Sequence, residues 1–177
     1  MKQLCPMVAC SLCMVSVLWS APEKNDARIL AESERVVSQY KAVMETAPQG
    51  IPSRNVVAGP LLGNGSLGVV LNATPEAWPL QFWTCKSSFS KLRHDHRKGG
   101  PRPFGTLDLS IPALEGGTWH SEQDLYSAIT TCTFTRDAAS ISVRTFVAAT
   151  EDLLIIELTN DGETPVTGEY TLWVAPG

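Results

Sequence analysis

A glycine-rich stretch, "GNGSLG" at residues 63–68, has the letters of a loop that binds the diphosphate of a dinucleotide. Such a loop needs a helix directly after it, because the N-terminus of that helix supplies the amide donors and the dipole that hold the phosphates. Here a short apolar and β-branched run, Leu67–Asn72, follows instead, and no Lys-Ser or Lys-Thr pair completes a P-loop. The sequence therefore argues against nucleotide binding and predicts a turn that leads into a strand.

The most polar stretch, "KLRHDHRKGGPR" at residues 91–102, contains two histidines on either side of Asp95. On an extended segment His94 and His96 share a face, as two ligands of a metal would, but a zinc site needs a third protein ligand. The remaining histidine, His120, lies far along the chain, so we predict no metal site and no cofactor. Two interpretations stay open, a solvated basic loop and a loop whose His and Arg side chains donate hydrogen bonds to sugar hydroxyls.

Paired carboxylates and exposed tryptophans are the side chains that carbohydrate chemistry uses. The sequence does not place any two carboxylates at the separation of about 5–10 Å that glycoside hydrolysis requires, so it predicts no catalytic residue. Trp83, beside Phe82, is our first candidate for stacking on a sugar ring, and packing in the core is its alternative. The same alternatives apply to three further tryptophans, Trp78, Trp119 and Trp173.

Length and composition bound the class of protein. The chain has 177 residues, of which 44% are hydrophobic and 18% charged, as suits one folded domain with a sizeable core. Its net charge of -4 gives no reason to expect nucleic acid as a partner.

The first residues differ from the rest of the chain and read as a leader. A lysine precedes an apolar run that ends in Ser20-Ala21, which is the pattern of a secretory signal peptide over residues 1–21. We therefore expect a secreted or periplasmic protein with no membrane span in its mature form. Removal of the leader would leave Cys85 and Cys132, which could form one disulfide or stay as two free thiols.

The elements that would position these groups are one helix and a series of strands. Apolar residues from Ile29 to Met44 recur at helical spacing, which predicts an amphipathic helix over residues 25–46 within an N-terminal segment of 22–49, its apolar face docked on the next domain. Residues 50–177 then read as a β domain with no helical period between its strands, so we expect an antiparallel β-sandwich. The strands are expected at 67–72, 80–84, 106–111, 129–136, 141–148, 153–159 and 170–174.

Four stretches together resemble a known family. "PLLGNGSLGVVL" (60–71) is similar to the opening motif of the N-terminal β-sandwich domain in glycoside hydrolase family 95 and in the related family 65 and six-hairpin enzymes. The stretches at 80–89, 121–134 and 143–159 resemble the strands that follow in those domains. One departure is Ser87-Ser88, which stand where related sequences tend to carry amide or acidic residues.

The resemblance implies a super-sandwich, incomplete in this chain, whose relatives continue into an (α/α)6 catalytic barrel that carries their catalytic carboxylates. We therefore expect this chain to be the non-catalytic N-terminal domain, a fragment, of a secreted glycoside hydrolase that acts on carbohydrate, and to support such a barrel. The alternative is a stand-alone carbohydrate-binding or cell-surface interaction module without catalysis. The substrate-binding candidates are Asn64, Trp83, Lys86, His94 and His96.

Overall fold

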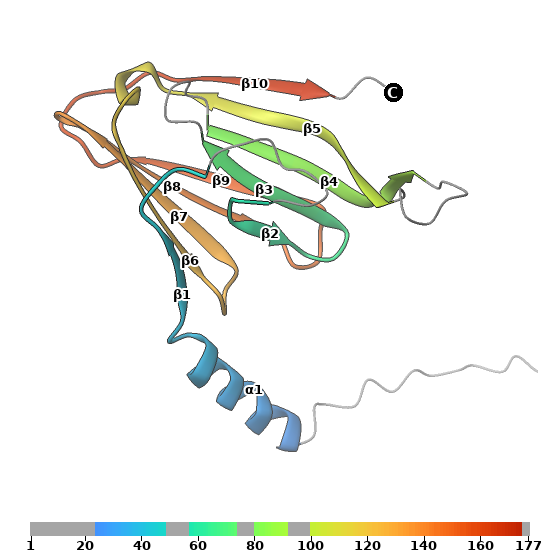
Figure 1. Cartoon of the computed structure of the whole chain (residues 1–177). Coiled ribbons are helices and arrows are strands. Elements are labelled where there is room, and N and C mark those ends of the chain that lie inside the picture. The colour runs from blue at the N-terminus through green and yellow to red at the C-terminus, as the bar shows by residue number, and fades with distance from the viewer. Residues whose placement is uncertain (1–23, 49–56, 74–79, 92–99, 175–177) are drawn as a thin grey trace, which may run out of the picture.

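The structure is a computed structural model that describes residues 24–48, 57–73, 80–91 and 100–174 (Figure 1). The described chain forms an α-helix, α1 (Lys24–Val37), a short 3-10 helix, η1 (Pro112–Leu114), and two five-stranded antiparallel sheets. Sheet A has the order β1 (Lys41–Met44), β6 (Thr118–Asp124), β7 (Ile129–Arg136), β8 (Ala139–Val147) and β9 (Leu154–Asn160). Sheet B has the order β10 (Glu169–Val174), β5 (Gly100–Ser110), β4 (Leu80–Lys91), β3 (Leu67–Ala73) and β2 (Leu61–Gly63). The predicted mainly-β sandwich, preceded by one helix, is confirmed.

Alternating residues of the two sheets face each other and build the core. Strand β7 illustrates the pattern, because Cys132 and Phe134 are buried while Thr131 and Thr133 on the other face are partly exposed. The ring of Trp119 meets that of Phe134 edge-on, with centroids 4.9 Å apart and planes at 78°, a favoured aromatic geometry. From sheet B the core receives alternate residues of β3 and β4, among them Leu67, Val69, Leu71, Leu80 and Phe82.

The strand predicted at residues 129–136 coincides with β7, and its link to the next strand is tighter than expected. Arg136 pairs directly with Ala139, so the hairpin loop consists of Asp137 and Ala138 alone, where the sequence suggests a four-residue link. Asp137 adopts a φ of 52°, which aspartate tolerates better than most residues. The short loop brings Ala139 and Ser140 into β8.

The helix prediction is wrong in its second half. Helix α1 ends at Val37, and Lys41–Met44 form β1, which pairs antiparallel with residues 121–124 of β6. The side-chain amide of Gln39 donates a 2.7 Å hydrogen bond to the carbonyl of Arg35 and so caps the helix end. Pairing with a neighbouring strand outweighs the helical spacing of these residues, because a segment of only four residues is compatible with both periods. The first strand of the sandwich, β1, thus lies inside the N-terminal segment 22–49 that is predicted as a helix and a linker.

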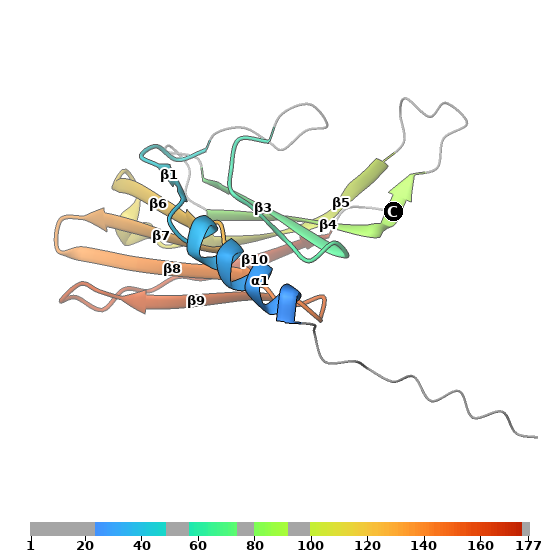
Figure 2. The same ribbon diagram turned by 90° about the horizontal axis from the view of Figure 1, so that it is seen from below.

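The expected docking of the helix on the sandwich is also wrong. Ile29 and Leu30 are each 62% exposed and Val36 is 39% exposed, so the apolar stripe of α1 is not covered by the domain that follows. The helix projects from the start of β1 (Figure 1), and a view from below shows it in front of the strands (Figure 2).

Candidate functional site

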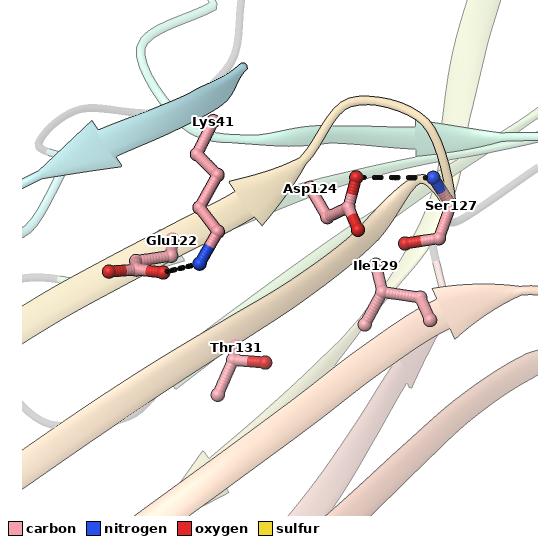
Figure 3. Close-up of a pocket in the computed structure, with 6 residues that line it drawn as sticks. All are labelled: Lys41, Glu122, Asp124, Ser127, Ile129 and Thr131. Carbon is pink, nitrogen blue, oxygen red and sulfur yellow. Dashed lines mark hydrogen bonds and ion pairs between the residues drawn. The ribbon is translucent and has the colours of Figure 1, made fainter. Parts of the chain in front are cut away.

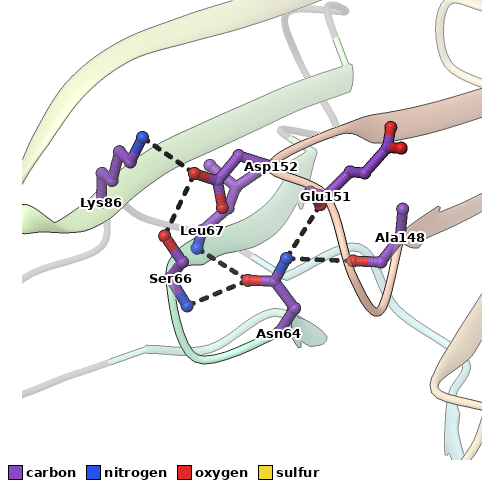
Figure 4. Close-up of polar contacts among 7 residues, drawn as sticks. All are labelled: Asn64, Ser66, Leu67, Lys86, Ala148, Glu151 and Asp152. Atoms are coloured by element: carbon purple, nitrogen blue, oxygen red, sulfur yellow. Dashed lines mark hydrogen bonds and ion pairs between the residues drawn. The ribbon is translucent and has the colours of Figure 1, made fainter. Parts of the chain in front are cut away.

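Asn64, a predicted sugar contact, occupies the turn between β2 and β3 and makes four hydrogen bonds through its side chain (Figure 4). Its Oδ1 accepts from the backbone amides of Ser66 and Leu67, both at 2.9 Å. Its Nδ2 donates to the carbonyls of Ala148 and Glu151 at 3.0 and 2.9 Å, in the loop between β8 and β9. An amide side chain has two donors and two acceptor positions, so Asn64 has none left for a ligand. We call this arrangement the Asn64 clasp, because it joins a turn of sheet B to a loop of sheet A.

Lys86, a second predicted sugar contact, belongs to the same clasp. Its Nζ lies 2.8 Å from Oδ2 of Asp152, which also accepts a 3.1 Å hydrogen bond from the hydroxyl of Ser66. Hydrogen bonding to Lys86, and to a smaller extent to Ser66, holds the pKa of the Asp152 carboxyl below its usual range. Asn64 and Lys86 are therefore brought together, and both contact the β8–β9 loop of the other sheet, Asn64 through backbone carbonyls and Lys86 through the Asp152 carboxylate.

The glycine loop that resembles a nucleotide fingerprint forms this clasp. The amides of Ser66 and Leu67, which a phosphate would need, bond to Asn64, and a strand follows them, as the sequence predicts. Gly65 supplies a φ of +89°, which a turn here requires and which L side chains rarely adopt.

The sequence allows either a disulfide between Cys85 and Cys132 or two free thiols. In the structure both cysteines are free. Cys132 lies in the core between the sheets, whereas Cys85 pairs with Gly68 on β3 and shares with Trp83 the face of β4 that points away from sheet A. Burial raises the pKa of the Cys132 thiol to about 12, so this side chain stays protonated and acts as a small apolar residue.

Trp83, the third predicted sugar contact, lies on the outer face of sheet B, the face that points away from sheet A. A single cross-strand row there contains Leu61, Val70, Trp83, Thr106 and Trp173, one residue from each strand. Thr106 is 5% exposed and separates the two tryptophans, of which Trp173 is 48% exposed and Trp83 partly exposed. Two strand spacings, about 10 Å, therefore separate the backbones that carry the two indoles.

Polar side chains form the next row of the same face. Gln81 pairs with Asp108, and Asp108 pairs with Thr171 of β10. Among the described residues, the indole N–H of Trp83 and one carboxylate oxygen of Asp108 are buried without a hydrogen-bond partner. We call the two tryptophans with Gln81 and Asp108 the tryptophan face. The sequence points to Trp83, but Gln81 and Asp108 join it only through the register of β4 and β5.

A separate hollow of about 210 Å³ lies on the outer face of sheet A (Figure 3). It is lined by Lys41, Glu122, Asp124, Ser127, Ile129 and Thr131. The hollow is not predicted from the sequence, because Lys41 falls in the predicted helix. The signal that indicates it is the alternation of Glu122 and Asp124 on one strand.

The charged groups of the hollow are bonded to each other or to the backbone. Lys41 Nζ lies 2.6 Å from Oε2 of Glu122, which lowers the carboxyl pKa and raises that of the lysine. Asp124 Oδ1 accepts from the amides of Tyr126 and Ser127 at 2.9 and 3.3 Å, and these bonds lower its pKa. The volume of the hollow falls below the range of about 300–1,000 Å³ that ligand pockets usually have.

His120 connects the end of β1 to β6 beside this hollow. Its Nδ1 lies 3.0 Å from Glu45 Oε2 and its Nε2 lies 3.4 Å from Glu122 Oε1. Hydrogen bonding to Glu45, and then to Glu122, raises the pKa of the imidazole above its usual 6.5. Among the described residues, no three His, Cys, Asp or Glu side chains are placed so that they could hold a metal ion. His94 and His96 lie outside the described residues.

This geometry predicts a pH-dependent contribution of His120 to stability. Because the pKa of His120 is raised on folding, its contribution is complete below pH 6.5 and is lost as the pH rises through the raised value. A ¹H–¹³C NMR titration is expected to show a His120 pKa above 6.5, with the signal assigned by its loss in His120→Gln. Stability differences between wild type and His120→Gln should shrink from pH 6 to pH 9. A constant difference over that range would contradict the ion pairing.

Comparison with known protein-family models gives no match, and comparison with curated protein sequences gives none either. The glycoside hydrolase resemblance therefore rests on the four stretches of sequence alone. No helix within the described ranges is long and apolar enough to cross a membrane.

Proposed function

We propose that this chain is a non-catalytic carbohydrate-binding sandwich, the N-terminal domain of a secreted glycoside hydrolase-like protein, and that it binds an oligosaccharide on the tryptophan face. The observation that carries the proposal is the row in which Trp83 and Trp173 flank the small Thr106. Aromatic rings bind the apolar faces of sugars, and a small residue between them leaves a flat surface. The backbones that carry the two indoles are two strand spacings apart, about 10 Å, which suits contact with two different rings of one extended saccharide.

The polar row beside the tryptophans supports the same ligand class. Gln81 offers donors and acceptors and Asp108 offers acceptors, as the hydroxyls of a sugar need. The hollow on sheet A is a weaker candidate, because the charges of Lys41, Glu122 and Asp124 already have partners.

The resemblance supports placing this sandwich in a glycoside hydrolase-like protein. Its first stretch folds as β2, the Asn64 turn and β3, and its third as the hairpin of β6 and β7, so the stretches correspond to adjacent strand pairs. In this proposal the Asn64 clasp keeps the two sheets in register, and the sandwich supports an (α/α)6 barrel that carries the catalysis.

Affinity electrophoresis in gels containing β-glucan, xylan, galactan or mannan tests the binding. We expect at least one polysaccharide to retard the chain, and Trp173→Ala to weaken that binding about tenfold, as loss of one aromatic contact of about 1.4 kcal/mol implies. Tyr126→Ala is the matched control, since Tyr126 is 46% exposed but lies in the hairpin of sheet A. Equal retardation of wild type and Trp173→Ala, or none on any polysaccharide, would contradict the proposal.

The absence of catalysis is tested separately with aryl glycosides. We expect no turnover by the purified chain. Turnover that disappears in Asp108→Asn or Glu169→Gln, whose carboxylates lie on the outer face of sheet B, would show that the sandwich itself is an enzyme.

A further inference from the structure

Asn64 and Gly65 form the only Asn-Gly pair in the sequence. Asparagine is a thermolabile residue, and it is most labile before glycine, because the missing Cβ leaves the next backbone nitrogen open to the side-chain carbonyl. That nitrogen can attack Cγ and release the amide nitrogen as ammonia. The pair therefore carries the chemistry of spontaneous deamidation at the centre of the Asn64 clasp (Figure 4).

The turn leaves the attacking nitrogen accessible. Gly65 is exposed, and no atom lies within 4 Å of the place where its Cβ would be. Its backbone amide donates no hydrogen bond to any residue in the described ranges, so solvent can remove its proton. Attack is therefore limited by the position of the Asn64 side chain and not by access to Gly65.

The clasp holds the group under attack in place. Oδ1 of Asn64 accepts from two amides of the turn, and Nδ2 donates to the carbonyls of Ala148 and Glu151 in the β8–β9 loop. Ring closure turns Cγ toward the Gly65 nitrogen and expels Nδ2, so it cannot proceed while all four hydrogen bonds are kept. The reaction therefore waits for the clasp to open, a local event that does not require global unfolding.

The product cannot close the clasp again. A carboxylate has acceptors only, so an oxygen in the place of Nδ2 would face the carbonyl oxygens of Ala148 and Glu151, and both would lose their donor. The new negative charge would also lie in the turn that Ser66 links to the carboxylate of Asp152. Conversion of Asn64 thus replaces two attractive contacts between the sheets by repulsive ones.

We propose that Asn64-Gly65 is a protected deamidation site, at which one spontaneous reaction permanently uncouples the two sheets. The Gly65 nitrogen loses its proton and bonds to Cγ of Asn64, the Cγ–Nδ2 bond breaks, and Nδ2 leaves with a proton as ammonia. Water then opens the resulting succinimide at either carbonyl, which gives aspartate or isoaspartate with no oxidation or reduction. The inference rests on the clasp and not on carbohydrate binding.

Peptide mass spectrometry of the purified chain, kept at neutral pH with and without denaturing urea, tests the protection. We expect residue 64 to deamidate at least about tenfold more slowly in the folded chain than in urea, since the clasp is open in fewer than about one molecule in ten. Lys86→Met should speed the reaction in the folded chain alone, because Lys86 holds Asp152 at the clasp. Lys41→Met is the matched control, since Lys41 is ion-paired to Glu122 on sheet A.

The stability of the product tests the consequence for the fold. Ion exchange separates the deamidated chain by its added negative charge, and its unfolding midpoint in urea should lie below that of the unreacted chain. Gly65→Ala should deamidate at residue 64 more slowly than wild type in urea, because its Cβ hinders attack on Cγ. Absence of the reaction in urea, equal rates with and without urea, or a deamidated chain as stable as the unreacted one would each overturn the proposal.

Discussion

Asn64→Ala is expected to lower the free energy of unfolding by about 3 kcal/mol, since it removes four hydrogen bonds of roughly 0.5–1.5 kcal/mol each. Two amides of the turn and two carbonyls of the β8–β9 loop lose their partner together. The loss weakens the link between the sheets, because the side chain reaches residues 84 and 87 positions away. Urea denaturation of both proteins measures the difference.

Asn160→Ala is the matched control for this prediction. Asn160 also bonds through both ends of its amide, to the carbonyl of Thr164 at 3.0 Å and the amide of Gly162 at 3.1 Å. Both contacts are local and exposed, so its loss is expected to cost about 1 kcal/mol. Equal effects of the two substitutions would mean that the Asn64 clasp does not hold the sheets together.

Gly59→Ala is the second substitution with a large expected effect, about 3 kcal/mol of destabilisation. A Cβ at Gly59 would lie 1.7 Å from the carbonyl oxygen of Leu71 and 2.8 Å from its carbonyl carbon. The obstacle is the backbone of β3. This strand cannot move aside, because the amide of Leu71 donates a hydrogen bond to the carbonyl of Pro60 and the strand has a neighbouring strand on each side. Overpacking at such a position usually costs about 1–3 kcal/mol, and the distance places this case at the upper end.

Gly65→Ala separates this steric effect from the conformational one. No atom lies within 4 Å of a Cβ there, but the φ of +89° is unfavourable for alanine. The expected cost is therefore the backbone strain alone, about 1 kcal/mol. Chemical denaturation of both variants checks the order. If Gly65→Ala were the more damaging change, the close approach of residue 59 to β3 would not be a constraint on the fold.

The sandwich itself is predictable from the sequence, because its strands alternate and end at turn residues. Strand β7 coincides with its predicted range, and Asn64-Gly65 marks the turn before β3. Three strands, β1, β2 and β6, are not predicted from the pattern of their own residues, although the resemblance implies a strand pair over residues 121–134. The residues of β1 also fit a helical period, and β2 is too short to show the alternation of a strand. Strand β6, "TWHSEQD", has polar residues at most positions. Their places are set by pairing with neighbours, which local sequence does not encode.

The candidate site is less predictable than the fold. Trp83 can be named from its residue type, but its alignment with Trp173 depends on pairing between strands far apart in sequence. Asn64 and Lys86 are predicted as sugar contacts, and the sequence does not show that both reach the β8–β9 loop of the other sheet. What sequence cannot supply in both cases is long-range register.

Two-dimensional ¹H–¹⁵N NMR of the indole N–H groups during oligosaccharide titration tests whether the tryptophan face binds carbohydrate. The signals of Trp83 and Trp173, assigned from Trp83→Phe and Trp173→Phe, are predicted to shift saturably with one common dissociation constant. The signal of Trp119, which packs on Phe134 in the core, should stay in place. Saturable binding that leaves both Trp83 and Trp173 unmoved, or that shifts only residues around Lys41 and Glu122, would contradict the assignment of carbohydrate binding to the tryptophan face.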